Sequence, residues 1–388
     1  MDTVGVVGLG YVGLQSALLA ASSGYRVIGV DLNEELVKRL SRGEPVLMER
    51  FVMENWRDDT LSRIEFTTSY EKLGEADVIL VAVQTPIRNC EIDYSPLKRA
   101  GEGLAKVIRK GTLVVNESTI YPGGTRELLG QPIERHRGWK AGREFYLAHC
   151  PERVNPGDDV YTMRNIPRVL GAVDPESLSL AANYYKSLGL RISVVGSIEI
   201  AELSKLLENT YRFLNISYVN ELKRLTDRVG IPIREVVEAS ATKPFGFHKH
   251  FPGPGVGGAC LPKDTLMLIE YARRAGFKLS ILEAAWQVNT TQPKYYADLI
   301  DETARKLGAR RILFYGYAYK PRGYSDYLSP VKLVGQELEK HGYTIRFHDP
   351  KLDGKAEDGL FEWADLVVTW GYSVDKDLDA KVVDLTKL

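Results

Sequence analysis

The fold is decided by residues 3–40, TVGVVGLGYVGLQSALLAASSGYRVIGVDLNEELVKRL. This stretch predicts a strand, a glycine turn, a helix and a second strand, and Gly8, Gly10 and Gly13 form the motif G-x-G-x-x-G. In a dinucleotide-binding turn the first glycine permits the tight bend, the second admits the pyrophosphate, and the third lets the helix pack on the strand. The second strand ends at Asp31, placed to accept ribose hydroxyls, and no arginine follows to bind a 2′-phosphate. The stretch therefore predicts a Rossmann unit that binds NAD.

Three further apolar segments follow at the spacing of alternating strands and helices. Their continuous apolar character is typical of parallel strands buried on both faces of a sheet. Their carboxyl ends carry Thr85, Thr119 and Glu152. We expect these three polar side chains to meet at one edge of the sheet, where the ligands of such sheets bind. The segments are ADVILVAVQTP (76–86), GTLVVNEST (111–119) and EFYLAHCPE (144–152).

Composition excludes several classes of partner. The chain has 388 residues, which predicts two or three domains. Its 51 basic and 51 acidic residues cancel, so nothing favours a nucleic acid or a membrane surface as partner. No apolar run approaches the ~20 residues of a membrane span. Because the first strand begins almost at Met1, we expect no signal peptide and a cytoplasmic location.

The chain has three cysteines, Cys90, Cys150 and Cys260. They are few, odd in number and scattered, which is typical of free thiols in a reducing compartment rather than of a disulfide framework. We expect Cys90 and Cys150 to be buried small apolar residues.

Residues 199–229, EIAELSKLLENTYRFLNISYVNELKRLTDRV, predict one long helix without Gly or Pro. Lys205 and Asn209 share one face of this helix, with Arg212 beside them. Either they form a solvated stripe, or they line a cleft between two domains. The apolar positions with the spacing of a buried face are Leu203, Leu206, Leu207, Tyr211 and Leu214.

The last segment repeats the predicted order of elements of the first segment. RRILFYGYAYK (310–320) resembles a strand running into a glycine turn, YTIRFHDP (343–350) ends its strand at Asp349, and WADLVVTWG (363–371) resembles a further strand. The repeat lacks G-x-G-x-x-G, so it need not bind a dinucleotide. It could hold another nucleotide, with Lys320 as a phosphate or sugar contact.

We therefore predict an α/β protein with two Rossmann-like, doubly wound parallel-sheet domains, joined by a long central helix and a helical region. The predicted boundaries are an NAD-binding domain at 1–195, a central region that contains Cys260 at 196–300, and a second Rossmann-like domain at 301–388.

Cys260 lies in PGPGVGGACLPKD (252–264), where four glycines let backbone approach a ligand closely. Pro262 is a favoured first-turn residue, so Cys260 would stand at a helix N-terminus, and Lys263 would further lower the pKa of its thiol. Asp264 is placed to accept a proton or to orient water. A thiolate beside NAD predicts a four-electron oxidation of a primary alcohol, in which a thiohemiacetal and then a thioester form on the cysteine and water releases an acid.

At this point the chain resembles the UDP-glucose/GDP-mannose dehydrogenase family nearly end to end. The resemblance implies oxidation of a nucleotide sugar at C6 to a uronic acid, with NAD as cofactor and no metal. It also implies a homodimer built on the helical centre, so that 196–300 is the dimerisation region with the catalytic cysteine and 301–388 binds the nucleotide sugar, a UDP-sugar. The segments that carry it are GLGYVGL, VQTP, ESTIYPGGT, CPERVNPG, AELSKLLENTYRFLNISYVNEL, PGPGVGGACLPKD and GYAYKPRGYSDYLSP.

The resemblance also implies residue roles. Cys260 matches the nucleophile, Lys205 and Asn209 the pair that stabilises the oxyanion and holds the sugar, and Asp264 the residue that positions water. Glu152 and Thr119 match positions near the nicotinamide and the hydrolytic water. The remaining cofactor positions are Gly8, Gly10, Tyr11, Val12, Gly13, Asp31, Thr85 and Lys263, and the remaining substrate positions are Arg153, Val154, Arg212, Lys249, His250, Phe251, Gly253, Gly257 and Lys320.

The sugar is inferred from smaller details. PERVNPG, with Arg153, Val154 and Pro156, resembles members that act on UDP-N-acetylhexosamines, as do KPFGFHKHFPGPG (243–255) and Arg212. CLPKD, by contrast, resembles the ending of UDP-glucose members, and Ala259 replaces a histidine frequent in the acetamido branch. We favour UDP-N-acetylglucosamine or UDP-N-acetylmannosamine, with UDP-glucose as the alternative.

Two further alternatives stay open. A two-electron hydroxyacid-type dehydrogenase would form one NADH per substrate and would leave GGACLPKD unexplained. A non-catalytic nucleotide-sugar-binding regulator is expected to lose catalytic groups, yet Cys260, Lys205, Asn209 and Asp264 are present. The chain also departs from the family at Tyr327, where the pattern Asp-x-Arg-x-Ser-Pro has arginine.

Overall fold

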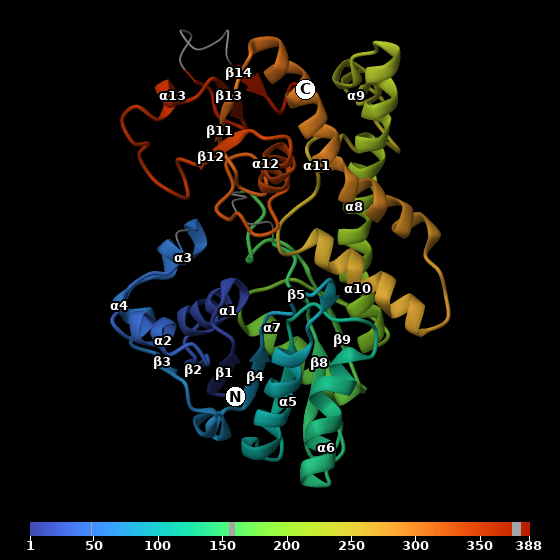
Figure 1. Cartoon of the computed structure of the whole chain (residues 1–388). Coiled ribbons are helices and arrows are strands. Elements are labelled where there is room, and N and C mark those ends of the chain that lie inside the picture. The colour runs from blue at the N-terminus through green and yellow to red at the C-terminus, as the bar shows by residue number, and fades with distance from the viewer. Residues whose placement is uncertain (48, 155–159, 375–381) are drawn as a thin grey trace. The chain divides into compact units, whose positions relative to one another are not determined.

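The computed structural model describes residues 1–47, 49–154, 160–374 and 382–388 (Figure 1). The chain divides into two compact units, Met1–Leu207 and Glu208–Leu388. The long helix α8 (Ile198–Val229) contains the boundary between them. The three-domain division at 1–195, 196–300 and 301–388 stays a prediction. Pro156, which entered the prediction of the sugar, lies outside the described residues.

The first unit is built on an eight-stranded sheet with the order β10-β9-β8-β7-β4-β1-β2-β3. From β3 to β8 all neighbours are parallel; β9 runs antiparallel to β8, and β10 parallel to β9. This is the alternating α/β topology predicted from the first 152 residues. The strands are β1 (Thr3–Val7), β2 (Arg26–Val30), β3 (Ile64–Thr67), β4 (Val78–Val81), β7 (Leu113–Asn116), β8 (Tyr146–His149), β9 (Arg168–Ala172) and β10 (Ile192–Val194).

Helices connect these strands. In α1 every residue from Gly13 to Ala21 is buried, and most of their side chains are small, which lets the helix pack closely on the sheet. Helix α7 begins after Asp174, whose carboxylate accepts the N–H groups of Glu176 and Ser177. The elements are α1 (Tyr11–Ser22), α2 (Glu34–Ser41), α3 (Arg50–Asn55), α4 (Asp58–Leu61), α5 (Ser95–Val107), α6 (Gln131–Arg137) and α7 (Pro175–Ser187), with η1 (Tyr70–Glu75), η2 (Arg126–Gly130) and the hairpin β5 (Ile87–Arg88) and β6 (Glu91–Ile92).

The second unit has a parallel four-stranded sheet of order β12-β11-β13-β14. Strands β11, β12 and β13 are the three predicted from the repeat. The strands are β11 (Arg311–Tyr315), β12 (Thr344–His348), β13 (Leu366–Thr369) and β14 (Val382–Asp384). The helices that follow α8 are α9 (Ile233–Ser240), α10 (Leu261–Arg274), α11 (Ser280–Leu307), α12 (Pro330–Lys340) and α13 (Leu360–Trp363).

The glycine turn of the first unit recurs in the second. The N–H of Gly8 donates to the carbonyl of Val30 at 2.8 Å, and the N–H of Gly316 donates to that of His348 at 2.8 Å. Both glycines have positive φ, +89° and +96°. A residue with a side chain would be strained at either turn.

The acid that follows each second strand differs between the units. Asp31 is partly exposed and accepts the N–H groups of Leu9 (2.8 Å) and Asn33 (2.9 Å). Asp349 is fully buried and accepts, besides backbone N–H groups, the hydroxyl of Tyr372 at 2.8 Å. The second unit therefore uses this carboxylate to support its own structure.

Two predictions about buried residues are wrong. Leu203, Leu207 and Tyr211 on α8 are 43%, 64% and 46% exposed, because they form a second apolar face that this single chain leaves uncovered. Cys90 is exposed, since it lies in the tight β5–β6 hairpin with φ +63°. Cys150 is buried as predicted, and burial raises the pKa of its thiol to about 12. Among the helices of the described residues, none has both the length and the apolar character needed to cross a membrane.

Candidate active site

The turn after β1 has the geometry that a dinucleotide needs. A Cβ on Gly8 would lie 2.7 Å from the carbonyl oxygen of Ala82, and one on Gly13 would lie 1.8 Å from that of Gly8. A Cβ on Gly10 would meet nothing closer than the side-chain nitrogen of Gln84 at 4.0 Å. Gly8 and Gly13 are thus required by the fold, whereas Gly10 leaves open space in front of the backbone.

Helix α1 begins directly behind this space. Its first residues, Tyr11 and Val12, are half-buried, and no acidic side chain lies in its first turn. The N-terminal amides and the positive end of the helix dipole therefore face no anion of the helix itself, which suits phosphate binding. With the partly exposed Asp31 as a ribose acceptor, these residues fit NAD.

The carboxyl edge of the sheet carries Thr85, Thr119 and Glu152. The hydroxyl of Thr85 donates to the carbonyl of Thr119 at 3.4 Å, so these two are brought together. One oxygen of Glu152 accepts the N–H groups of Arg153 (2.7 Å) and Val154 (2.8 Å). Its other oxygen forms an ion pair with Arg168 at 2.5 Å. Sequence reasoning missed Arg168, because a basic residue at the start of a strand carries no local signal.

Glu202 on α8 supports the loop that follows Thr119. Its carboxylate is fully buried and accepts the N–H groups of Gly123 (2.6 Å) and Thr125 (2.8 Å). Burial raises the pKa of Glu202 to about 7, although these two donors favour the charged form. Lys205 follows one turn later and is itself 9% exposed, so it does not belong to a solvated stripe.

In the second unit, Cys260 is exposed and is the N-cap residue of α10, with Pro262 in the first turn, as predicted. The N–H of Asp264 donates to the carbonyl of Cys260 at 2.9 Å. The carboxylate of Asp264 is fully buried between the Asn209 amide nitrogen (2.5 Å) and the Lys263 ammonium (2.8 Å). The structure thus brings Asn209, Lys263 and Asp264 together at the start of the helix that presents Cys260.

Three carboxamide side chains hold the glycine-rich loop in front of Cys260. Asn220 accepts the N–H of Gly253 at 2.9 Å, and Gln292 donates to the carbonyl of Gly253 at 3.1 Å. Asn289 bonds both backbone groups of Val256, accepting the N–H at 2.6 Å and donating to the carbonyl at 3.1 Å. Sequence reasoning missed all three. The signal that could have identified them is a polar side chain at a position on an otherwise apolar helical face.

The loop before α12 packs directly on these glycines. A Cβ on Gly257 would lie 2.2 Å from the carbonyl oxygen of Leu328. The N–H of Gly258 donates to the carbonyl of Tyr327 at 3.1 Å, so Tyr327 contributes through its backbone. A Cβ on Gly258 would lie 2.7 Å from the ring of Tyr319. Burial raises the pKa of Tyr319, the electrostatic interaction with Cys260 adds to this rise, and Arg212 opposes it.

The predicted substrate residues at 249–251 make contacts within their own unit. Lys249 donates to Glu238 at 2.9 Å, the His250 ring lies 2.9 Å from the carbonyl of His248, and the Phe251 ring lies 4.6 Å from the Arg234 guanidinium. Lys320 lies 5.7 Å from the ring centre of Tyr319.

The predicted site residues are divided between the two units. No group of His, Cys, Asp or Glu suited to hold a metal ion occurs in the part of the chain that the structure describes. The first unit carries Gly8, Gly10, Tyr11, Val12, Gly13, Asp31, Thr85, Thr119, Glu152, Arg153, Val154 and Lys205, and the second carries Asn209, Arg212, Lys249, His250, Phe251, Gly253, Gly257, Cys260, Lys263, Asp264 and Lys320.

Comparison with known proteins identifies the family of the chain. Residues 2–189 match the NAD binding domain of the UDP-glucose/GDP-mannose dehydrogenase family, and residues 199–291 match its central domain. The UDP-N-acetyl-D-mannosamine dehydrogenase of Pyrococcus horikoshii is 32% identical over 94% of this chain and 88% of its own length. The UDP-N-acetyl-D-glucosamine 6-dehydrogenase of Pseudomonas aeruginosa is 32% identical over 93% and 85%.

A solved structure agrees over the same length. The structure of UDP-D-ManNAc dehydrogenase from Pyrococcus horikoshii superposes with a TM-score of 0.91, at 31% identity, over 99% of this chain and 95% of that one. The chain belongs to the UDP-glucose/GDP-mannose dehydrogenase family.

Proposed function

We propose that the chain catalyses the NAD-dependent, four-electron oxidation of the C6 hydroxymethyl group of a UDP-sugar to the UDP-uronic acid. The observation that carries this proposal is the exposed Cys260 at the N-terminus of α10, with the buried Asp264 one turn away and tied to Asn209. A two-electron dehydrogenase has no use for a thiol presented in this way. In this proposal residues 1–195 bind NAD, residues 196–300 provide the catalytic cysteine and the dimer contacts, and residues 301–388 bind UDP.

Cys260 acts as the nucleophile in this proposal. NAD, when bound, would supply two successive two-electron oxidations, in each of which one NAD would accept one hydride. The first converts the alcohol to an aldehyde, and the Cys260 sulfur adds to the aldehyde carbon to give a thiohemiacetal. The second gives a thioester, and water cleaves the C–S bond to release the acid and the thiol. The sum is one alcohol, two NAD and one water, converted to one carboxylate and two NADH with release of three protons.

The other predicted residues support these steps. Lys205 and Asn209 stabilise the oxyanion that develops on C6, and Asp264, held by Asn209 and Lys263, accepts or relays protons at Cys260. Thr119 and Glu152 orient the hydrolytic water.

The favoured sugar is an N-acetylhexosamine, UDP-N-acetylglucosamine or UDP-N-acetylmannosamine. Support comes from the activities in the names of the two relatives and from Arg153, Val154 and Arg212. UDP-glucose is the alternative to be tested beside them.

The proposed assembly is a homodimer formed through α8. Exposed apolar residues recur along this helix at steps of three, four and seven, which keeps them on one face. A face of this kind is typical of a contact between subunits. The residues are Ile200, Leu203, Leu207, Tyr211, Tyr218, Leu225 and Val229. Three cysteines without a disulfide favour a reducing compartment, so we also propose the cytoplasm.

The decisive experiment counts NADH per mole of limiting sugar nucleotide. UDP-N-acetylglucosamine, UDP-N-acetylmannosamine and UDP-glucose are compared for the wild type, for Cys260→Ser, and for Cys90→Ser as a matched control, since Cys90 is also an exposed thiol. Two NADH from one sugar, lost in Cys260→Ser and kept in Cys90→Ser, are expected. One NADH, or activity indifferent to Cys260, would contradict the proposal and favour the two-electron alternative. No NADH with tight sugar-nucleotide binding would favour the regulator.

A further inference from the structure

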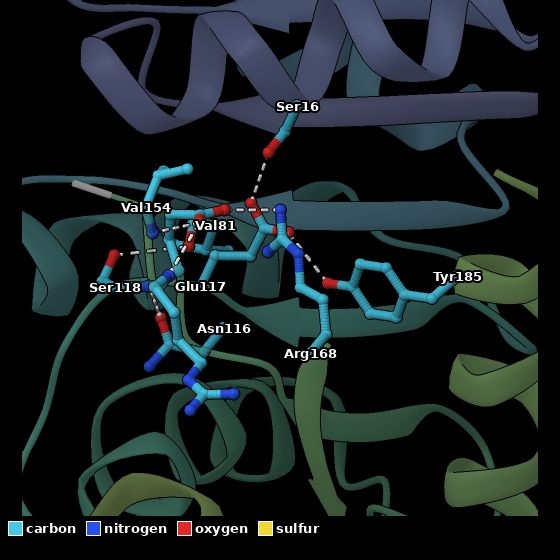
Figure 2. Close-up of polar contacts among 10 residues, drawn as sticks. Ser16, Val81, Asn116, Glu117, Ser118, Val154, Arg168 and Tyr185 are labelled. Atoms are coloured by element: carbon cyan, nitrogen blue, oxygen red, sulfur yellow. Dashed lines mark hydrogen bonds and ion pairs between the residues drawn. The ribbon is translucent and has the colours of Figure 1, made fainter. Parts of the chain in front are cut away.

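A buried cluster of charges lies beneath the carboxyl edge of the first sheet. Arg168 begins β9, Glu117 follows β7, and Glu152 follows β8. Their side chains are 4%, 1% and 9% exposed. Figure 2 shows the Arg168 guanidinium beside the Glu117 carboxylate, with Ser16 and Tyr185 reaching the same carboxylate from other elements.

The two carboxylates are bound to different nitrogens of one guanidinium. One terminal nitrogen of Arg168 lies 3.3 Å from Glu117, and the other lies 2.5 Å from Glu152. The planar fork of an arginine can hold two acids in this way, whereas a lysine offers a single charged atom.

The two acids differ in how firmly they are held. Glu117 is anchored by the hydroxyls of Ser16 (2.6 Å, from α1) and Tyr185 (2.9 Å, from α7). Glu152 lies in a loop, and besides its ion pair with Arg168 it accepts the N–H groups of the next two residues. Arg168 therefore connects a fixed carboxylate to one whose orientation depends on it.

A structural ion pair between Arg168 and Glu117 would be complete without Glu152. Burying a second carboxylate costs desolvation, which only a close cation offsets. Burial raises the pKa of Glu117, and the charge of Arg168 opposes this rise. The second ion pair holds the Glu152 carboxylate at the edge of the sheet, next to the strand ends that carry Thr85 and Thr119.

We propose that Arg168 is a positioning residue for hydrolysis of the thioester: anchored on Glu117, it fixes the orientation of the Glu152 carboxylate. This inference rests on the proposed function, in which Glu152 orients the hydrolytic water. Through Ser16 the same network reaches α1, the helix that begins at the dinucleotide turn.

The test separates hydride transfer from hydrolysis by rapid mixing with saturating NAD and the UDP-sugar. NADH formed before the thioester is cleaved appears as a fast phase, and later turnovers as a slow phase. Glu152→Gln is expected to slow the slow phase by about 100-fold. Arg168→Lys keeps the charge but loses the fork, and is expected to slow it by about tenfold, as is typical of residues that orient a functional group. The rate of the fast phase and the dissociation constant for NAD should stay unchanged in both.

The double variant decides whether Arg168 acts through Glu152. Adding Arg168→Lys to Glu152→Gln should cause no further loss, because the group that Arg168 positions is already gone. The matched control is Arg109→Lys, which alters an arginine paired with Asp77 at the amino edge of the same sheet and should leave both phases unchanged. If Arg168→Lys does not fold, Glu117→Asp retracts the anchor by one methylene and is expected to give the same hydrolysis-specific defect.

Several outcomes overturn the inference. One is a further loss of hydrolysis rate when Arg168→Lys is added to Glu152→Gln. Another is a slowed fast phase with a normal slow phase in either single variant. The third is a slow phase at the wild-type rate in Arg168→Lys or Glu152→Gln, while the wild type forms two NADH. A wild type that forms no NADH from any UDP-sugar would instead contradict the proposed function, and this inference would fall with it.

Discussion

Gly10 differs from the other two glycines of its motif, because nothing in the protein occupies the place of its absent Cβ. The backbone of the turn forbids a side chain at Gly8 and Gly13, at 2.7 Å and 1.8 Å from carbonyl oxygens, but tolerates one at Gly10. A requirement for glycine at that position therefore comes from the ligand rather than from the fold. Substitutions at Gly8 or Gly13 therefore test the stability of the fold, and a substitution at Gly10 tests the binding of the dinucleotide.

Gly10→Ala is accordingly expected to weaken NAD binding without destabilising the protein. One methyl group in the space for the pyrophosphate should raise the dissociation constant about tenfold or more, equivalent to about 1–3 kcal/mol of steric cost. Isothermal titration with NAD and thermal unfolding of the free protein measure the two effects. Gly13→Ala is the contrasting variant and should lower the melting temperature. Unchanged NAD affinity in Gly10→Ala would contradict binding at this turn.

Glu202 makes a second prediction, about pH and stability. Its pKa is about 7 in the folded protein and 4.5 as the reference value, so the folded state binds the proton more tightly. The stability it contributes is fully present below pH 4.5 and is lost as the pH rises through 7, to a total of about 3 kcal/mol. Glu202→Gln should abolish this loss.

Urea unfolding of wild type and Glu202→Gln between pH 4 and pH 8 measures the difference between them. The difference is needed because other groups act oppositely: burial lowers the pKa of His149 to about 3, which adds stability as the pH rises. Parallel pH profiles for the two proteins would show that Glu202 does not titrate in this range.

At the scale of elements, α8 and α11 hold the glycine-rich loop through carboxamides. Asn289 lies 33 residues from Val256 in the chain and satisfies both of its backbone groups. The loop has few side chains with which to hold itself, so its shape depends on helices that precede and follow it.

Asn289→Ala should therefore lower both stability and turnover. Two hydrogen bonds of about 1 kcal/mol each are lost and two backbone groups are left unpaired, so the free energy of unfolding should fall by about 2–3 kcal/mol. The value of kcat should fall because Cys260 is no longer held in place, whereas NAD affinity should not change. Thr290→Ala, on the exposed side of the same helix, is the control. An Asn289→Ala enzyme with normal kcat would contradict the role of the glycine-rich loop in holding Cys260 for catalysis.

The sequence predicted most of these elements and few of the bonds between them. Strands and helices carry periodic signals, so the sheet around β1 and the position of Cys260 before α10 could be read from the chain. Other contacts join residues that lie far apart in the sequence, so no periodic pattern predicts them. Examples are the contacts of Asn289, Arg168 and Glu202 with distant backbone groups or charges. Cys90 was predicted to be buried from its residue type, but the geometry of a tight hairpin exposes it.

At the scale of the whole molecule, α8 explains the wrong prediction for Leu203, Leu207 and Tyr211. The helical period correctly identified an apolar face, but periodicity does not distinguish a face covered by the same chain from one covered by a partner. The exposed side chains on this face favour the second case.

Leu207→Glu is therefore expected to convert the proposed dimer into a monomer. Leu207 is 64% exposed, so a carboxylate there costs little in an isolated chain but would be buried in an interface. Light scattering coupled to size exclusion measures the mass. Phe277→Glu, at a site that is 63% exposed and off α8, is the matched control and should stay dimeric. A wild type that is monomeric at high concentration would contradict the proposed assembly.

Gly316 and Asp349 repeat the backbone bonds of Gly8 and Asp31, yet the Tyr372 hydroxyl caps the acid in the second unit. A search by backbone geometry alone would find two Rossmann turns in the described residues, although the second of them lacks the full set of glycines of the dinucleotide motif. One phenol, together with the missing second and third glycines, separates the two turns. An engineer who wanted a second dinucleotide site here would have to remove Tyr372 and also rebuild the turn that follows Gly316.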